Sequence, residues 1–527
     1  MKIISSFTIL LTVLHLCVSV NSANILGIYT QDIKSHYLIA QNLLRELANS
    51  GHNVTVFTVF KTQNLPQNYK EITLNLPSLD EFKKEMAKDG SAFNLIYQGQ
   101  IFIGRSKNST KEVVLHEKMQ HFLKSKNSID VILMGFSESP ILFGLSKELN
   151  APIIVTSPQP LCYVFEPYTG AYAHDSFVPN LLLNLNDKMN FKERCLNTAV
   201  NFIARVSMRL MYWVQRDLLN ELYPNSNYNL WEMIQNSVQL MLINSHFTIN
   251  RPLPYMTNMI EVAGLHIPDQ INTLPFSLKK FMDEAENGVI YFCMGATLKM
   301  KDLDLEKKLL IVNALKKISM RVVIKWDDDS TINELTPGTK FYASNWLPQN
   351  DILAHPNLRA YITHGGILST TEGIYHGVPI VGIPIFGDQR KNIKKIIEFG
   401  IAVQVEYDTL SVETLSEAIS RVTQNKTFDT NAKELSKRFR DRPMTPVKTA
   451  QYWVEYVIRY KNQDFMRSPA MNLNMIEYFN CDVNFTFLII ILIGSYINWK
   501  IFKWSVKKLI GIFKKKSKSQ NPKIKKS

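Results

Sequence analysis

Apolar and polar positions in the first part of the chain alternate in blocks that predict strands separated by helices. Residues 25–29 predict a strand, residues 36–49 a helix that ends before Gly51, and residues 53–58 the next strand. Further runs that continue this alternation lie at residues 129–135, 145–150, 152–157 and 240–245. Such a succession is typical of the βαβ units of a doubly wound parallel sheet.

A second succession of the same kind begins near residue 288. Residues 288–295 predict a strand that enters a glycine turn, followed by a helix at residues 304–317 and a strand at residues 321–326. The chain length of 527 residues leaves room for two sizeable domains. The pattern therefore predicts two α/β domains in one chain.

A linker and a helical region separate the two successions. Residues 187–239 predict helices rich in Met, Tyr, Trp and Leu, and the proline-rich residues 251–275 predict the linker. The predicted segments are an N-terminal domain at residues 23–250, the linker at residues 251–275, a C-terminal domain at residues 276–440, and a returning helix with a membrane-proximal segment at residues 441–482.

Both ends of the chain carry segments typical of membrane targeting. Residues 1–22 combine a lysine, an apolar run and small residues, which predicts a cleaved secretory signal peptide. Residues 483–502 predict a transmembrane helix, although the short uninterrupted apolar core leaves an interfacial helix as the alternative. Residues 503–527 predict a basic cytosolic tail, and residues 523–527 read as a lysine-based retrieval signal. These features predict a single-pass type I protein of the endoplasmic reticulum membrane with a lumenal body.

The formal net charge of +14 arises mainly from the C-terminal tail. Residues 500–527 contain 11 lysines and no acidic residue, which leaves a charge of about +3 for the rest of the chain. A basic balance confined to a tail does not indicate a nucleic-acid partner, so none is expected.

A lumenal body would expose acceptor sites for glycans, and three sequons meet this expectation at Asn53, Asn108 and Asn425. Four cysteines remain after removal of the signal peptide, and none is spaced as a metal ligand. Whether any two of them form a disulfide stays open at this point; they are Cys162, Cys195, Cys293 and Cys481.

Residues 345–389 hold the densest group of candidate functional residues. Residues 360–363 predict a buried strand, His364-Gly365-Gly366 a tight turn, and residues 369–376 a helix. Glycines allow the backbone to approach a ligand closely, and the start of the helix directs N–H groups and a positive dipole end toward it. This geometry suits a phosphate group.

Polar side chains beside this turn fit the rest of a nucleotide sugar. Glu372 lies one helical turn beyond the phosphate site, where a carboxylate can accept hydrogen bonds from ribose hydroxyls. Asp388 and Gln389 follow a second apolar run at residues 378–385 and offer acceptors and a donor to sugar hydroxyls.

The same residues carry a resemblance to a known family. The pattern Thr363-His-Gly-Gly with Glu372, the run from Pro379 to Gln389, and Asn345-Trp-Leu-Pro-Gln-Asn upstream resemble the signature of UDP-glycosyltransferases, of the membrane-bound UDP-glucuronosyltransferase type. His-Gly-Gly-Ile-Leu-Ser is most similar to invertebrate members, and Tyr361 departs from the small residue or Phe usual in the family. The resemblance implies two Rossmann-like domains that face a cleft, the GT-B arrangement, with a C-terminal transmembrane helix.

The resemblance implies a catalytic base in the first domain. Ser35-His36 matches the family position of that base, at the carboxyl edge of the sheet. The family usually orients the base with an Asp at a strand end, where this chain has Gly135. Glu138 is the predicted substitute, and a solvated loop carboxylate is the alternative; Asp130, at the other end of the strand, is predicted to be structural.

The resemblance also implies a UDP-sugar site in the second domain. Trp346 is expected to stack on uracil with Gln349 at its edge, Glu372 to hold ribose, and Asp388 with Gln389 to hold the donor sugar. The remaining UDP contacts are expected from side chains and amides near the diphosphate, namely His364, Gly365, Gly366 and Thr297, the last standing in for a family Ser.

These features predict inverting, metal-independent transfer of a hexose from a UDP-sugar to a hydroxyl of a small lipophilic molecule, a detoxification-type conjugation. UDP-glucose is the more strongly expected donor, ahead of UDP-glucuronate. No cofactor beyond this co-substrate is expected. One alternative is a degenerate binder of UDP-sugars or lipophilic ligands, suggested by Gly135 and Ala296. A second is a metal-dependent transferase that uses residues 327–329, an Asp triplet. Homo- or hetero-oligomers are both compatible with the sequence.

Overall fold

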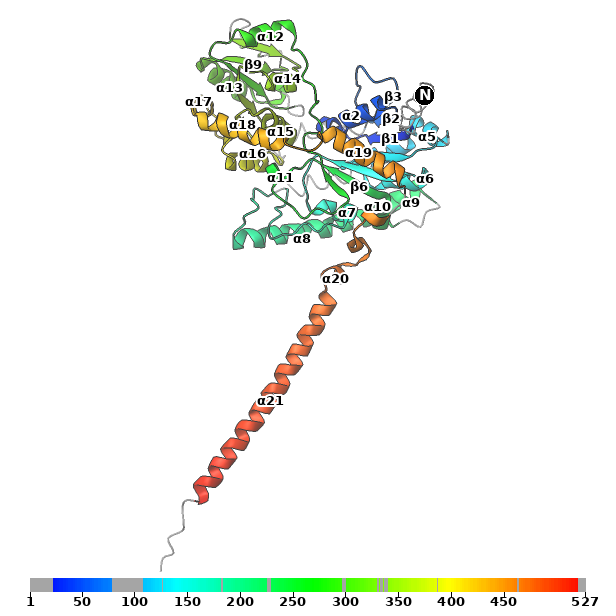
Figure 1. Ribbon diagram of the computed structural model, residues 1–527, viewed down its shortest axis with the longest axis vertical. Helices are drawn as coiled ribbons and strands as arrows, with labels where there is room; N and C mark the ends of the chain where they lie inside the picture. Colours follow the sequence, from blue (N-terminus) through cyan, green and yellow to red (C-terminus); the bar gives the residue numbers. More distant parts are fainter. Residues whose placement is uncertain are drawn as a thin grey trace, which may run out of the picture. The chain divides into compact units, whose positions relative to one another are not determined.

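The computed structural model of the chain (Figure 1) describes residues 22–77, 108–125, 127–181, 183–224, 229–295, 300–328, 331, 335, 340–385, 387–461 and 464–519. The predicted signal peptide, apart from Ser22, lies outside these ranges, as do Thr297 and Asp329. The described chain divides into two units. The first, larger unit ends at Ser468, and the second begins at Pro469.

The first part of the larger unit is built on a parallel sheet whose described strands follow the order β3-β2-β1-β4-β5-β6-β7. Every neighbouring pair in this order is parallel. The strands are β1 (Asn24–Tyr29), β2 (Asn53–Thr58), β3 (Tyr69–Thr73), β4 (Val131–Gly135), β5 (Ile153–Ser157), β6 (Val238–Ile243) and β7 (Met259–Glu261).

The second part repeats this arrangement with described strands in the order β10-β9-β8-β11-β12-β13, again all parallel. The strands are β8 (Val289–Cys293), β9 (Arg321–Lys325), β10 (Phe341–Ser344), β11 (Leu358–Thr363), β12 (Ile380–Gly382) and β13 (Ala402–Gln404). Both sheets therefore have the doubly wound order that the alternating pattern predicts.

Central strands are buried on both faces, as expected where helices cover a parallel sheet. In β4, Ile132 and Met134 belong to one hydrophobic cluster while Val131 and Leu133 belong to the cluster on the opposite face. Because side chains alternate along a strand, each sheet separates two cores.

Helices surround the two sheets (Figure 1). Those of the first part are α2 (Lys34–Asn49), α5 (Glu117–Lys124), α6 (Leu145–Glu148), α7 (Glu166–Thr169), α8 (Phe191–Val214), α9 (Arg216–Leu222), α10 (Leu230–Ser237) and α11 (Phe247–Asn250). Those that follow are α12 (Phe276–Asp283), α13 (Leu305–Lys317), α14 (Gln349–Leu353), α15 (Ile367–His376), α16 (Gln389–Glu398), α17 (Val412–Gln424), α18 (Lys426–Arg440) and α19 (Pro446–Arg459).

Helix α19, in the segment predicted to hold a returning helix, packs against the first sheet. Its buried residues Val447, Ala450 and Val454 share a core with Ile25 of β1 and Leu43 of α2. Figure 1 shows α19 beside α2 and β1, although about 400 residues of chain separate them.

Three strands differ from the sequence prediction. The hydrophobic pattern did not indicate β3 or β10, because both are short and only partly buried. Residues 259–261, assigned to the linker, form β7 at the edge of the first sheet. A strand of three residues is too short to show an alternation of its own.

The smaller unit contains α20 (Met475–Tyr478) and α21 (Cys481–Ser519). Within the described residues, one helix is long and apolar enough to cross a membrane, with a mean hydropathy of 1.8 over its most apolar window. This candidate span, Cys481–Lys516, includes the predicted residues 483–502.

Candidate functional site

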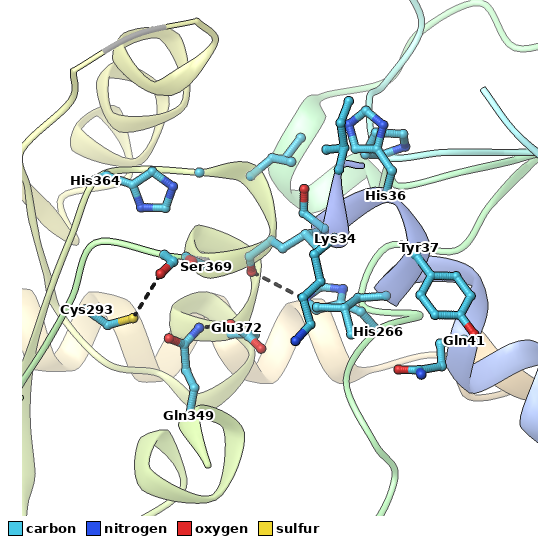
Figure 2. Close-up of a pocket in the computed structure, with 18 of the residues that line it drawn as sticks. Lys34, His36, Tyr37, Gln41, His266, Cys293, Gln349, His364, Ser369 and Glu372 are labelled. Carbon is cyan, nitrogen blue, oxygen red and sulfur yellow. Dashed lines mark hydrogen bonds between the residues drawn. The ribbon is translucent and has the colours of Figure 1, made fainter. Parts of the chain in front are cut away.

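The candidate site lies where the strand order of each sheet reverses. In the first sheet this point is between β1 and β4, and in the second it is between β8 and β11. Ligands of open α/β sheets bind at the carboxyl ends of such strands. Residues from both switch points line one cavity of about 1080 Å³, with His36 on one side and His364 on the other (Figure 2).

The turn after β11 forms a cradle that suits a phosphate. Gly365 has a φ of +86°, and Gly366 precedes the first turn of α15. A Cβ atom at Gly365 would lie 2.5 Å from the Ile393 side chain, and one at Gly366 would lie 2.6 Å from the His364 ring. A side chain at Gly365 would therefore be both strained and crowded, and one at Gly366 would displace the His364 ring. Gly366, Ile367 and Leu368, at the start of α15, line the cavity, where the N-terminus of a helix suits an anion.

Glu372 and Gln349 form a fixed pair on the second-domain wall of the cavity. Gln349 donates a hydrogen bond to the Glu372 carboxylate and accepts one from the Tyr291 hydroxyl at 3.2 Å. Burial raises the pKa of Glu372 to about 7. Trp346 lines the same cavity with 69% of its surface exposed, which leaves its ring free to stack on a planar ligand.

His364 is held in a neutral state. Burial lowers the pKa of its imidazole to about 4, with Asp388 acting in the opposite direction. The ring packs against Gly295, where a Cβ atom would lie 2.4 Å from it. At neutral pH this side chain can offer a hydrogen bond but no charge.

A positive charge near the cradle comes from a residue that sequence analysis missed. Lys325, at the end of β9, lines the cavity and donates a hydrogen bond to the Gly295 carbonyl at 2.7 Å. A lysine at the carboxyl end of a predicted strand was the available signal, but the strand's place beside β8 could not be read from the sequence.

Asp388 and Gln389 occupy the start of α16, but they differ in what they can offer. The Gln389 side chain is buried, and its Oε1 accepts a hydrogen bond from the Ile385 amide at 2.8 Å. The Asp388 carboxylate accepts hydrogen bonds from Asn392 at 2.9 Å and from Gln159 at 3.2 Å. Since Gln159 belongs to the first domain, Asp388 connects the two walls of the cleft.

His36 lies in the first turns of α2, with its ring beside the loop after β4. Its Nδ1 is 2.9 Å from the Ser137 hydroxyl. Burial lowers the pKa of the imidazole to about 4, and Asp388 partly counteracts this. The ring is therefore neutral at pH 7 and can accept a proton.

Glu138 does not hold His36, so the predicted direct pairing is wrong in this structure. Its carboxylate accepts hydrogen bonds from the Thr30 amide at 2.7 Å, the Thr30 hydroxyl at 2.6 Å and the Gln31 amide at 3.1 Å. Only 4% of its surface is exposed, which also excludes the solvated alternative. Burial raises its pKa to about 7, and these hydrogen bonds limit the rise. Glu138 braces the loop that leads from β1 to His36.

The space beside Gly135 explains why Glu138 takes this place. A Cβ atom at Gly135 would lie 3.3 Å from the Tyr29 ring and 3.7 Å from Cγ of Glu138. The glutamate side chain therefore passes next to the space that a side chain at position 135 would enter.

The described members of the Asp triplet make contacts inside the protein. The Asp327 carboxylate accepts a hydrogen bond from the Met300 amide at 2.6 Å, and Asp328 forms a buried ion pair with Lys308 at 2.7 Å. Among the residues that the structure describes, no group of three or more His, Cys, Asp or Glu side chains is arranged to hold a metal ion.

The other predicted residues have simpler environments. Asp130 accepts a hydrogen bond from the Asn24 amide at 2.8 Å and pairs with Lys461, a structural role as predicted. The sequon asparagines Asn53, Asn108 and Asn425 are exposed. The four cysteines in the described part of the chain are free thiols, Cys162 and Cys293 buried and Cys195 and Cys481 exposed.

Comparison with known proteins decides the family. Residues 25–516 match the family model described as UDP-glucoronosyl and UDP-glucosyl transferase. The chain belongs to the UDP-glycosyltransferase family. UDP-glycosyltransferase UGT5 of Dactylopius coccus is 34% identical over 485 residues, covering 90% of each chain. Human UDP-glucuronosyltransferase 2B15 is 30% identical over 472 residues, covering 85% of this chain and 87% of the relative.

Solved structures share the fold of this UDP-glycosyltransferase. A UDP-glucose:anthocyanidin 3-O-glucosyltransferase in complex with UDP superposes with a TM-score of 0.54 at 15% identity, over 83% of this chain and 99% of the neighbour. A UDP-glucosyltransferase from Polygonum tinctorium gives a TM-score of 0.55 at 13% identity, over 84% and 99%. The predicted family and GT-B arrangement are confirmed, and the protein is a UDP-sugar-dependent glycosyltransferase.

Proposed function

We propose that this UDP-glycosyltransferase transfers a hexose with inversion, without a metal ion, to a hydroxyl of small lipophilic molecules. UDP-glucose is the proposed donor, in preference to UDP-glucuronate. The observation that carries the proposal is a neutral, half-buried His36 in the same cavity as the glycine cradle of α15. A base and a phosphate site in one cleft are what direct displacement at an anomeric carbon requires.

The reaction proceeds in one displacement. His36 accepts the proton of the acceptor hydroxyl while that oxygen bonds to the anomeric carbon of the donor. The bond from this carbon to the UDP oxygen breaks on the opposite face, which inverts the configuration. The Gly365 and Gly366 region, the dipole of α15 and the Lys325 ammonium stabilise the leaving UDP.

Ser137 is the proposed positioning residue for the base. An Nδ1–H that donates to the Ser137 hydroxyl leaves Nε2 unprotonated and able to accept the acceptor's proton. Asp388, which acts to raise the pKa of His36, favours the imidazolium formed during transfer. In this chain a serine thus takes the place next to the base where the family has an aspartate.

Replacing Ser137 by alanine is expected to lower kcat by about 10-fold, because one oriented hydrogen bond to the base is lost. The KM for the donor should stay unchanged, since Ser137 is not in the donor wall. Ser139→Ala is the matched control: its hydroxyl lies two residues away, is buried and has no hydrogen-bond partner. Equal kcat values for Ser137→Ala and Ser139→Ala would show that Ser137 does not position the base.

The overall activity is tested by UDP release from membranes that contain the full chain. UDP-glucose and UDP-glucuronate are each offered with a panel of lipophilic phenols and alcohols. Product with UDP-glucose supports the proposed donor, and faster turnover with UDP-glucuronate reverses the donor assignment. UDP binding without product for any pair would favour the degenerate binder, the alternative that Gly135 suggests.

Metal independence is tested by chelation. EDTA should leave the rate of UDP release unchanged, because Asp327 and Asp328 already bind the Met300 amide and Lys308. The Asp327→Ala variant serves as the second arm and should retain activity in EDTA. Activity that disappears in EDTA and returns with Mg²⁺ or Mn²⁺ would establish the metal-dependent mechanism instead.

We further propose that α21 anchors the protein in the endoplasmic reticulum membrane with the body in the lumen. The apolar span Cys481–Lys516 and the lysine-rich end of the chain support this placement. A lumenal body predicts glycans at the exposed Asn108 and Asn425. Glycosidase treatment of membranes should increase the mobility of the protein, and an unchanged mobility in the presence of intact sequons would contradict the orientation.

A further inference from the structure

Helix α8 buries polar residues and exposes apolar ones, the reverse of an ordinary surface helix. Its buried face contains Asn197, Asn201 and Arg205, followed by Met208 and Tyr212. Its exposed face carries large apolar side chains, of which Phe202 and Trp213 each keep 66% of their surface accessible. These exposed side chains are Phe191, Leu196, Phe202, Ile203, Val206, Leu210, Trp213 and Val214.

The buried polar face fixes the rotation of the helix. The Arg205 guanidinium forms ion pairs with Glu166 at 2.9 Å and with Asp175 at 3.0 Å. Asn197 donates hydrogen bonds to two backbone carbonyls, and Asn201 donates one to Asp175 at 2.8 Å. Turning α8 to cover its apolar face would expose these groups or leave them buried without partners, which is strongly unfavourable. The apolar exposure is therefore built into the fold.

The exposed apolar side chains form one continuous stripe. At about 100° of rotation per residue, the eight positions fall within an arc of about 140°, which places them on one face of the helix. With 24 residues, α8 is about 36 Å long. The exposed charged side chains on the helix are all basic, namely Lys192, Arg194 and Arg209.

A lipid bilayer is the partner whose chemistry fits this stripe. A long apolar face on a helix whose exposed charges are all basic, with a tryptophan near one end, is the pattern of a helix that lies in the membrane interface. Soluble proteins rarely leave so long an apolar face open to water. The exposed basic side chains of α8 also suit lipid phosphates, whereas they would repel their own copies across a symmetric pairing of two α8 helices.

The chain itself holds the body near a membrane. Residues 469–480 join the body to α21, and a segment of this length reaches at most about 40 Å. A tether this short gives the bilayer a high effective concentration around the body, so even weak affinity of α8 leads to binding.

We propose that the exposed stripe of α8 binds the surface of the bilayer, as a second membrane contact in addition to the anchor. This inference rests on the anchor proposed for α21. The contact is peripheral: the apolar side chains enter the interface while the Arg205 cluster stays within the protein.

The test separates the body from its anchor after the full chain has been reconstituted. A specific protease site is inserted at residues 472–474, and the purified protein is placed in phosphatidylcholine vesicles. After cleavage of the outward-facing molecules, the vesicles are sedimented, and the released body is quantified. The wild-type body should remain with the vesicles.

Two sets of three substitutions provide the comparison. Phe202→Ser, Val206→Ser and Leu210→Ser together remove the middle of the stripe and should weaken membrane partition of the cleaved body by roughly 100-fold or more. The matched control replaces exposed apolar residues elsewhere, with Ile271→Ser, Phe276→Ser and Leu305→Ser. The control body should stay with the vesicles. UDP release in detergent checks that both variants are folded.

Three results would overturn the inference. The wild-type body could be released as fully as the stripe variant, which shows that the anchor alone holds the protein. Copies could cross-link efficiently through Cys195, which is exposed on α8, in a Cys481→Ser background; the stripe would then be an interface between copies. Uncleaved protein that fails to associate with vesicles would refute the anchor and this inference together, while leaving the transferase proposal intact.

Discussion

His36→Ala is expected to abolish sugar transfer while leaving UDP binding unchanged. General-base catalysis contributes roughly 10²–10⁴ to the rate, so we expect kcat to fall by about 10³. His36 belongs to the first domain, whereas the residues proposed to bind UDP belong to the second. UDP titration calorimetry should therefore give the same dissociation constant for the variant and the wild type.

The exposed His174 provides a matched control for this substitution. His174→Ala should behave as wild type in both assays. A His36→Ala enzyme with wild-type kcat would show that another group takes the acceptor's proton. If kcat and UDP affinity fell together with the thermal stability, the effect would be one of folding and the assignment of the base would lose its support.

Glu372→Ala should have the second largest effect, on donor binding. A half-buried carboxylate that accepts hydrogen bonds from ribose hydroxyls contributes about 1.5–3 kcal/mol to binding, so the Kd for UDP should rise roughly 10- to 100-fold. The Kd of Glu372→Gln for UDP should lie between the values of the wild type and of Glu372→Ala, because the glutamine amide retains one acceptor. Calorimetry with UDP measures the change, and thermal unfolding checks the loss of the Gln349 contact.

A comparison of ligands sharpens this prediction. Wild type should bind 2′,3′-dideoxy-UDP much more weakly than UDP, whereas Glu372→Ala should bind the two with similar affinity. The surface variant Glu434→Ala should discriminate as wild type does. If Glu372→Ala still preferred UDP as strongly as wild type, the ribose contact would have to be assigned to another residue.

The residues proposed for the donor half of the site could be located from the sequence because their geometry is local. Gly365, Gly366 and Glu372 all lie in the turn after β11 or in the helix that follows it. Glycines at positions that need unusual backbone angles mark such turns in a sequence. Asp388 and Gln389 follow the next strand directly. Their placement required only the order of elements, which the hydrophobic pattern supplies.

The surroundings of His36 were harder to predict because they depend on contacts between loops far apart in the chain. Ser137 is 101 residues from His36, and Glu138 is 108 residues from Thr30, so no local pattern ranks one as the partner of the imidazole. Lys325 was missed for the same reason. The short β3, β7 and β10 leave too few residues for a recognisable alternation.

The return of α19 means that the half of the enzyme built on the first sheet is discontinuous along the chain. Val447, Ala450 and Val454 complete a core that otherwise belongs to β1, α2 and their neighbours. An exchange of this half between two relatives must therefore move α19 together with the N-terminal segment. A hybrid with a single junction in the linker would pack the core of one parent against the α19 helix of the other. A hybrid with two junctions, which takes the N-terminal segment and α19 from the same parent, avoids this mismatch.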